Sequence, residues 1–306
     1  ILADGEGQRP VRGLVTGFAA TPAMDYAVGD ASDCYQGLER YLRHVISVAP
    51  DYHVIFDEIA TGGPAREIEV LLHTTPDGEF TVGGRPLPVG ESREGRDCSV
   101  RRTGEAVAQF VLPDRLIFEH RQHPHCESYG HYLAARVPRV SDETIAWVLA
   151  AGPAGAVDVQ ARAVEGVQRA VQVRIGDAVD TIALGGGEVT EVGDVAFTGD
   201  AAMVRDGRTG ADRYALVAGT SLMLGQVKLI AGDAPVSAGA VIREGLLLAA
   251  IACEQPATVT LHCPVEPRMV RLTGIDAPVD VSFDEDAQAV TLALPAGSFR
   301  LEVGSL

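Results

Sequence analysis

Lysine is nearly absent from this chain of 306 residues: Lys228 is the only one, so almost all of the 25 basic residues are arginines. With 42 acidic residues, the formal net charge is −17. A field of this sign repels polyanions, so a nucleic-acid or anionic-membrane surface is not expected. An anionic ligand would have to meet a local group of arginines, whose planar guanidinium matches a carboxylate.

Paired cysteine motifs and long apolar runs are also missing. The five cysteines contain no Cys-x-x-Cys pair, so neither a disulfide framework nor a cysteine zinc site is predicted. Cys253 and Cys263 could pair across adjacent strands, but buried free thiols are the favoured reading. No run of about 18 uncharged apolar residues occurs, which argues against a membrane span. The first residues have neither the basic start nor the apolar core of a signal peptide, so cytoplasm, periplasm and cell exterior all stay open.

Helical periodicity is the third absence, and short alternating segments separated by Gly, Pro and Asp turns take its place. This pattern predicts an all-β fold of stacked antiparallel sheets, a super-β-sandwich, with no helix longer than about three turns. A hydrophobic content of 46% is enough for one or two domains with their own cores. The turn-rich segment at 206–212 predicts a large domain over 1–215 and a smaller C-terminal sandwich over 216–306.

Polar groups of chemical interest are concentrated between Tyr26 and His73. Segments 40–48, 52–59 and 67–75 alternate as strands, and the first, with Tyr41, Arg43 and Val45 on one face, is predicted to have one wet side. In the third segment the odd positions share one face. His73 therefore projects beside acidic and hydroxyl side chains rather than into an apolar layer, where it can reach a ligand.

Asp30 and His73 are the first candidates for chemistry, because carboxylate and neutral imidazole are both ordinary zinc ligands. They are far apart in the sequence. The alternative is a turn aspartate and a half-buried histidine that make ordinary hydrogen bonds, and Asp33 is an equally placed competitor. Tyr35 and Tyr41 could act as general acid or base or bind a sugar, or they could simply close the edge of a core.

The segment His120–Cys126 holds three histidines and a cysteine in seven residues, and His131 follows soon after. Such a cluster can bind a metal or a sugar. Its polar content and Pro124 favour a solvated loop instead. Gly185–Gly187 lacks the ending and the following helix of a phosphate loop, and no G-x-S-x-G nucleophile motif occurs.

Several phrases resemble the β-sandwich region of the heparinase II/III-like polysaccharide lyases, a bacterial family that includes oligoalginate lyases and heparin/heparan lyases. They are ILADGEGQ, DYAVGDASDCY, LERYLRHVISV, YHVIFDEI, EVLLH and TLALPAGSFRLEV. The resemblance covers most of the chain and is most specific within residues 1–75. It implies β-elimination on uronic-acid polysaccharides, in a cleft between the sandwich and a helical toroid that precedes it.

The resemblance also implies roles for particular residues. The principal Asn, His and Tyr catalytic residues of the family lie on the toroid, outside this chain. A zinc ion is held by His, Asp and His, of which the Asp of the GD-x-x-x-x-Y phrase matches Asp30 and the second His matches His73. The first His would lie just upstream of Ile1, where the chain reads as cut from a longer polypeptide. Tyr41, and with less weight Tyr35, matches a region where relatives place a substrate-facing tyrosine.

The expected function is therefore the β-sandwich part of a polysaccharide lyase, inactive alone, with Arg43 and Arg66 near the cleft. The expected partners are an acidic polysaccharide and the upstream helical toroid, and a homo-oligomer stays open. The alternative is a non-catalytic carbohydrate-binding or structural sandwich. A glycoside hydrolase would need paired carboxylates, and the sequence offers many acids but no preferred pair.

Overall fold

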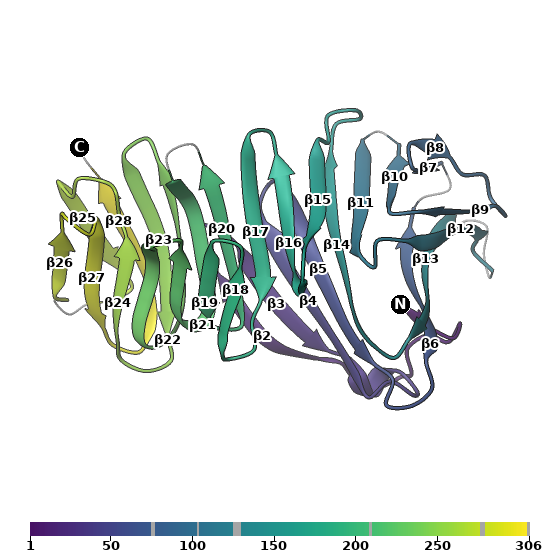
Figure 1. Ribbon diagram of the computed structural model, residues 1–306, viewed down its shortest axis with the longest axis horizontal. Helices are drawn as coiled ribbons and strands as arrows, with labels where there is room; N and C mark the ends of the chain where they lie inside the picture. Colours follow the sequence, from purple (N-terminus) through teal and green to yellow (C-terminus); the bar gives the residue numbers. More distant parts are fainter. Residues whose placement is uncertain (75–76, 103, 125–129, 208–209, 276–278, 305–306) are drawn as a thin grey trace. The chain divides into compact units, whose positions relative to one another are not determined.

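The computed structural model describes residues 1–74, 77–102, 104–124, 130–207, 210–275 and 279–304 (Figure 1). Within these ranges the chain is all-β, as the alternation predicts, with a single short 3-10 helix, η1 (Ser32–Cys34), and no α-helix. No helix in the described ranges is long and apolar enough to cross a bilayer. The strands form antiparallel sheets that are stacked in sandwich-like layers.

The chain folds into two compact units. The first contains Ile1–Phe18 and Ala27–Ala161, and the second contains Ala19–Tyr26 and Arg162–Leu306. Residue 215, the boundary expected from the sequence, lies inside β21 (Gly210–Leu224), a strand of the second unit's sheet. The strands on either side of 208–209 belong to one sheet, because β20 (Ala201–Gly207) pairs directly with β21.

The first unit has a five-stranded sheet and most of a nine-stranded sheet. The five-stranded sheet has, in spatial order, β1 (Leu2–Ala3), β6 (Arg66–His73), β13 (His131–Val140), β12 (Leu116–Gln122) and β9 (Ser92–Gly95). The nine-stranded sheet has, in spatial order, β2 (Leu14–Ala20), β3 (Asp25–Asp30), β4 (Arg40–Val48), β5 (Tyr52–Ala60), β14 (Asp142–Gly152), β11 (Glu105–Leu112), β10 (Asp97–Arg101), β7 (Glu79–Val82) and β8 (Arg85–Pro86).

One hydrophobic core lies between these two sheets. The five-stranded sheet contributes Ile68 and Phe118, and the nine-stranded sheet contributes Tyr41, Phe110 and Trp147. The indole of Trp147 is stacked on the Phe110 ring, with ring centroids 5.6 Å apart. The face of β4 that carries Tyr41 and Val45 lies toward this core: Tyr41 is buried and Val45 packs against it. Their large side chains gain more from burial than from contact with water.

The second unit is built mostly on a fourteen-stranded sheet. Its main path runs through β15 (Val159–Val164), β16 (Val167–Ile175), β17 (Ala178–Leu184), β20, β21, β22 (Val227–Arg243), β23 (Leu246–Cys253), β28 (Gly297–Gly304) and β25 (Met269–Thr273). Its side branches are β18 (Val189–Val192), β19 (Val195–Thr198), β24 (Ala257–His262), β26 (Val281–Asp284) and β27 (Ala289–Leu294).

Two long strands, β21 and β22, carry this sheet from one layer to the other. The first part of β21 pairs with β20, and its last four residues pair with β19. The change occurs where the register shifts on both sides of Gly219. A side chain there has no room, because a Cβ on Gly219 would lie 2.2 Å from the Thr198 carbonyl oxygen. Glycine is thus required where the strand bends across its neighbours.

The cysteines that the structure describes are free and buried, as favoured from the sequence. Cys34 and Cys98 lie in the first unit, and Cys253 and Cys263 lie in the second. Burial raises the pKa of the Cys98, Cys253 and Cys263 thiols. Cys126 lies outside the described residues.

Replacing Gly219 by Ala tests the bend in β21. The added Cβ would clash with the backbone of β19 and with Leu216, and overpacking of this kind costs about 1–3 kcal/mol of unfolding free energy. Gly186→Ala is the matched control, because its nearest atom would lie 3.9 Å away. Urea unfolding followed by circular dichroism should give a lower midpoint for Gly219→Ala and an unchanged one for the control. Equal midpoints for both variants would show that β21 needs no glycine here.

Candidate functional site

His73 ends strand β6 on the face of the five-stranded sheet that points away from the core. Ile68 and Val70 point into the core, and Glu69 and His73 point the other way, as the alternation predicts. The imidazole lies against the ring of Tyr132, the opposite residue on β13, with ring centroids 5.3 Å apart. Partial burial and the charge of nearby His123 hold the pKa of His73 below its ordinary value. The ring is therefore neutral at pH 7 and has a lone pair to offer.

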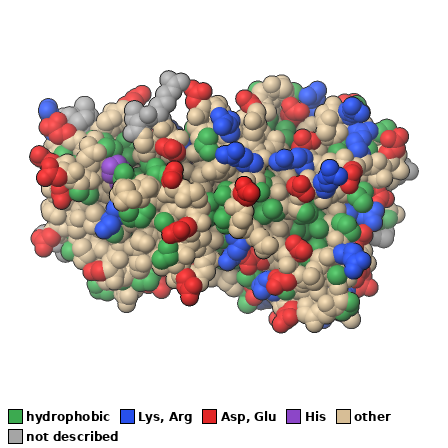
Figure 2. Space-filling view, viewed as in Figure 1, with side chains coloured by type: hydrophobic (Ala, Val, Ile, Leu, Met, Phe, Trp, Pro, Cys, Tyr) green, Lys and Arg blue, Asp and Glu red, His purple; other side chains and the backbone are tan. Residues whose placement is uncertain are grey.

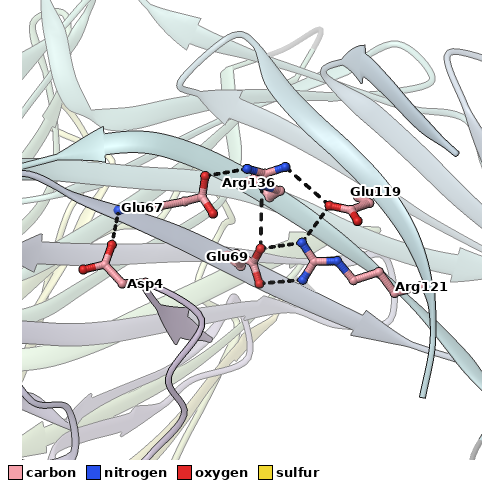
Figure 3. Close-up of polar contacts among 6 residues, drawn as sticks. All are labelled: Asp4, Glu67, Glu69, Glu119, Arg121 and Arg136. Atoms are coloured by element: carbon pink, nitrogen blue, oxygen red, sulfur yellow. Dashed lines mark hydrogen bonds and ion pairs between the residues drawn. The ribbon is translucent and has the colours of Figure 1, made fainter. Parts of the chain in front are cut away.

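An ion-pair network that includes Glu69 of the same strand covers this face (Figure 3). Glu69, only 2% exposed, accepts two hydrogen bonds from Arg121 on β12, at 2.9 and 2.7 Å. Arg121 also donates to Glu119 at 2.7 Å. Arg136 on β13 donates to Glu67 at 2.7 Å and to Glu119 at 3.4 Å. Three strands are joined by these bonds.

The network lowers the charge that this face offers to a ligand. Hydrogen bonds from Arg121 hold the pKa of Glu119 low, and those to Glu119 and Glu69 raise the pKa of Arg121. Both arginines on this face are thus already matched with carboxylates of the same sheet. An incoming uronate carboxylate would have to compete with Glu69 and Glu119, so the face is not a ready-made anion site.

Tyr35, Tyr41 and Arg43 form a second group, on the core side of the nine-stranded sheet. Arg43 on β4 donates two hydrogen bonds to Asp57 on β5, at 2.6 and 2.9 Å. The indole nitrogen of Trp147 lies 3.4 Å from the same carboxylate. The two tyrosine rings meet edge to face at 5.4 Å.

Both tyrosines of this group are buried, and burial sets their chemistry. Burial, followed by the charge of Asp57, raises the pKa of Tyr41 far above its ordinary value, and burial raises the pKa of Tyr35. The phenols are therefore protonated across the physiological range and can donate a proton or a hydrogen bond. The Tyr35 hydroxyl lies 3.3 Å from the carbonyl oxygen of Ile1. The side chain of Arg43 is about a third exposed (36%), so it is the group here with access to water.

Asp30 ends strand β3 and organises the turn that follows. Its Oδ1 accepts hydrogen bonds from the backbone nitrogen and the hydroxyl of Ser32, at 2.9 and 2.6 Å. The Ser32 hydroxyl oxygen in turn accepts a bond from the Tyr41 backbone nitrogen at 2.9 Å. These bonds from Ser32 hold the pKa of Asp30 low. Asp30 is a charged carboxylate that also serves as a turn aspartate.

Asp30 and His73 come from different sheets of the first unit, and their donor types suit zinc. One is an ionised carboxylate and the other a neutral imidazole, as a zinc site requires. Within the described residues, however, no three His, Cys, Asp or Glu side chains form a group that could hold a metal ion. A zinc ion at these two residues would need a further ligand.

The arginines expected near a cleft are both committed to acids. Arg43 pairs with Asp57, and Arg66 pairs with Asp4 at 3.1 Å at the start of β6. On the face shown in Figure 2, Lys and Arg side chains gather mainly over the part that belongs to the first unit, and acidic side chains are spread more widely. Local basic groups therefore exist despite the net charge, but the ones described above carry their own counter-ions.

A contact between buried His120 and partly exposed His131 was missed from the sequence. His120 was expected in a solvated loop, and this is wrong, because it lies on β12 with its side chain in the core, two residues after the buried Phe118. Its Nδ1 donates to the Leu87 carbonyl oxygen at 2.6 Å, and its Nε2 lies 2.6 Å from Nδ1 of His131. The alternation Leu116, Phe118, His120 was the signal that would have found it. His125 and Cys126 lie outside the described residues.

The protonation of His120 predicts how stability depends on pH. Burial, partly offset by the Leu87 carbonyl, holds the pKa of His120 below its ordinary value. The unfolded chain therefore binds more protons as the pH falls through about 6.5, so the stabilisation is present above that pH and is lost below it. His120→Gln should flatten the fall in urea midpoint between pH 7 and pH 5, and the exposed control His53→Gln should keep it. Parallel pH curves for wild type and His120→Gln would contradict this.

No protein-family model matches the sequence, and no curated protein matches it. Among solved structures, a Paenibacillus xanthan lyase is similar over 97% of this chain, with a TM-score of 0.52 and 9% sequence identity. The chondroitin AC lyase of Streptomyces coelicolor A3, in complex with chondroitin sulphate, is similar over 97% of this chain, with a TM-score of 0.44 and 10% identity. This chain spans 30% of the xanthan lyase chain and 40% of the chondroitin AC lyase chain. The chain therefore shares the fold of the matched part of the xanthan lyase chain.

Proposed function

We propose that this chain is the β-sheet part of a polysaccharide lyase of the heparinase II/III-like type, which cleaves uronic-acid-containing polysaccharides by β-elimination. The observation that carries the proposal is the likeness of fold to xanthan lyase over 97% of the chain. The phrases ILADGEGQ, DYAVGDASDCY and EVLLH support the narrower assignment.

β-Elimination needs a base for the proton beside the uronate carboxylate, a group that neutralises the carboxylate, and an acid for the leaving oxygen. We assign the principal base and acid to a helical toroid outside this chain. Tyr41, and with less weight Tyr35, is the contribution from this chain. Because both phenols stay protonated, the role that suits them is proton or hydrogen-bond donation rather than proton removal. Both are buried, so a substrate would reach them only when the surrounding residues are displaced.

Arg43 is the candidate for neutralising a uronate carboxylate from this chain. Its guanidinium is bound to Asp57, which is fully buried, and its own side chain is partly exposed. Asp57 holds the guanidinium in place and leaves its outer edge open to a ligand. An arginine fixed in this way loses little side-chain entropy when it binds a second carboxylate.

Zinc is the proposed metal, with Asp30 and His73 as ligands and a histidine upstream of Ile1 as the third. Both donors are in the form that zinc binds, an ionised carboxylate and a neutral imidazole. When bound, zinc would supply a structural cross-link at the floor of the cleft, since elimination needs no metal-activated water. Asp30 would bring the turn before Tyr41 to this point, and His73 would bring the end of β6.

A structural or non-catalytic carbohydrate-binding sandwich is the second candidate. The observation in its favour is that Arg121 and Arg136 are already paired with glutamates and that both tyrosines are buried. Such a chain would support a neighbouring domain without acting on the substrate.

An activity assay separates the two candidates. The chain alone should form no unsaturated uronate from alginate, heparin or related polymers, because the base and acid lie elsewhere. The chain joined to its upstream segment should form it, measured as ultraviolet absorbance, and Tyr41→Phe in that longer protein should lower kcat by about 10²-fold or more. His53→Gln is the control and should leave kcat unchanged. Robust product formation by the chain alone would show that the active site has been assigned to the wrong part of the protein. An inactive longer protein would favour the structural candidate.

Metal content tests the zinc assignment independently of activity. The longer protein should retain zinc after dialysis, measured by mass spectrometry, and His73→Ala should release it, because one of three ligands is lost. Zinc at 100 times its Kd should stabilise the wild-type protein by about 2.7 kcal/mol, seen as a raised melting temperature. His53→Ala is the matched control and should retain the metal. A longer protein that stays metal-free in excess zinc would exclude the site.

A further inference from the structure

Strand β2 is an apolar strand at the edge of the nine-stranded sheet. In the described part of the chain it pairs with β3 alone. Leu14 is 64% exposed, Val15 76% and Phe18 71%, and Val11 just before the strand is 49% exposed. These side chains are a large share of the exposed large hydrophobic residues of the described chain. Apolar exposure concentrated in one segment marks an interaction surface.

The other sheet edges of the first unit are protected, and β2 is not. At the far edge of the nine-stranded sheet, β8 has two residues, one of them proline. In the five-stranded sheet, edge strand β1 has two residues, and edge strand β9 carries Arg93 and Glu94. Short length, proline and charge are the devices that keep strand edges apart. Strand β2 has seven residues with neither charge nor proline, so its outer backbone groups are available for pairing.

We propose that β2 pairs antiparallel with β2 of a second copy of this chain, about a two-fold axis at Thr16, so that the nine-stranded sheets of two copies join. With this axis, Leu14 lies opposite the partner's Phe18 on one face of the joined sheet. Val15 lies opposite the partner's Gly17 on the other face, where the absent side chain leaves room. Cross-strand pairs of aromatic and aliphatic residues stabilise such a ladder.

Charge also favours a second copy at this strand. Residues 7–24 contain Arg9 and Arg12 but no acidic residue, in a chain whose net charge is −17. Two copies that meet here therefore bring no acidic side chains of this segment together, unlike most of the surface of a chain with this net charge. Antiparallel pairing brings Arg12 of each copy toward the end of the partner's β2, where Asp25 begins β3. A two-fold axis makes each of these contacts occur twice, as in most homodimers.

Pairing through β2 is independent of the chemistry proposed for this chain, so the oligomeric state tests it alone. Sedimentation velocity at micromolar concentration should give the mass of two chains of 32.2 kDa each. Thr16→Lys should give monomers, because two lysines would lie directly opposite at the axis. Val189→Lys, which replaces another highly exposed valine (67%) on β18, is the matched control and should stay dimeric.

The register is tested by charge rescue. Leu14→Glu and Phe18→Lys should each give monomers, because each removes an apolar pair twice. The double variant should restore the dimer, because every glutamate then faces a lysine of the partner. Hydrogen exchange of wild type needs no variant: amides of residues 14–20 should exchange more slowly at high than at low protein concentration.

Three outcomes would overturn the proposal: a wild type that is monomeric at all concentrations, a Thr16→Lys variant that is as dimeric as wild type, or exchange at β2 that ignores concentration. If the chain does not self-associate and a strand of another protein protects β2 instead, the β2 edge is the binding site of that other protein. A dimer without charge rescue would overturn the axis at Thr16.

Discussion

The carboxylate of Glu69 is the group on which the outer face of the five-stranded sheet depends. It is almost without contact with water, and an ionised carboxylate in that position is costly unless it is paired. Arg121 and Arg136 supply the pairing from two further strands, β12 and β13. The same bonds link β6, β13 and β12 across the face, and the β6–β13 pairing places Tyr132 opposite His73. The charged side chains of this face therefore hold one another in place, and a ligand would have to compete with these bonds.

The fold class and the strands around His73 could be predicted because their signal is local. The segments at 40–48 and 52–59 alternate over a full strand length, and the observed strands β4 and β5 match them within one residue. β7 to β10 were not predicted, since they are short and β8 and β9 contain Arg, Pro or Glu at positions typical of turns. Strand β12 was hidden by its polar end, which was read as a loop.

The polar networks could not be predicted, because their partners are far apart in the chain. Glu69 and Arg121 are separated by 52 residues, and Asp57 and Trp147 by 90. Such pairs depend on strand order and register. A one-residue slip in register would turn every side chain of the strand to the opposite face of the sheet. The sequence pointed to Arg43 and Arg66 as cleft residues, and each is found with an acid of its own.

The four cysteines that the structure describes are buried and give each unit its own chemical reporter of opening. Cys34 and Cys98 are enclosed in the first unit, and Cys253 and Cys263 in the second. A thiol reacts as the thiolate, so a buried cysteine is inert until its surroundings open. The rate at which each pair becomes reactive is then a measure of the local opening of that unit alone. The native cysteines thus allow the frequency of local opening to be compared between the two units.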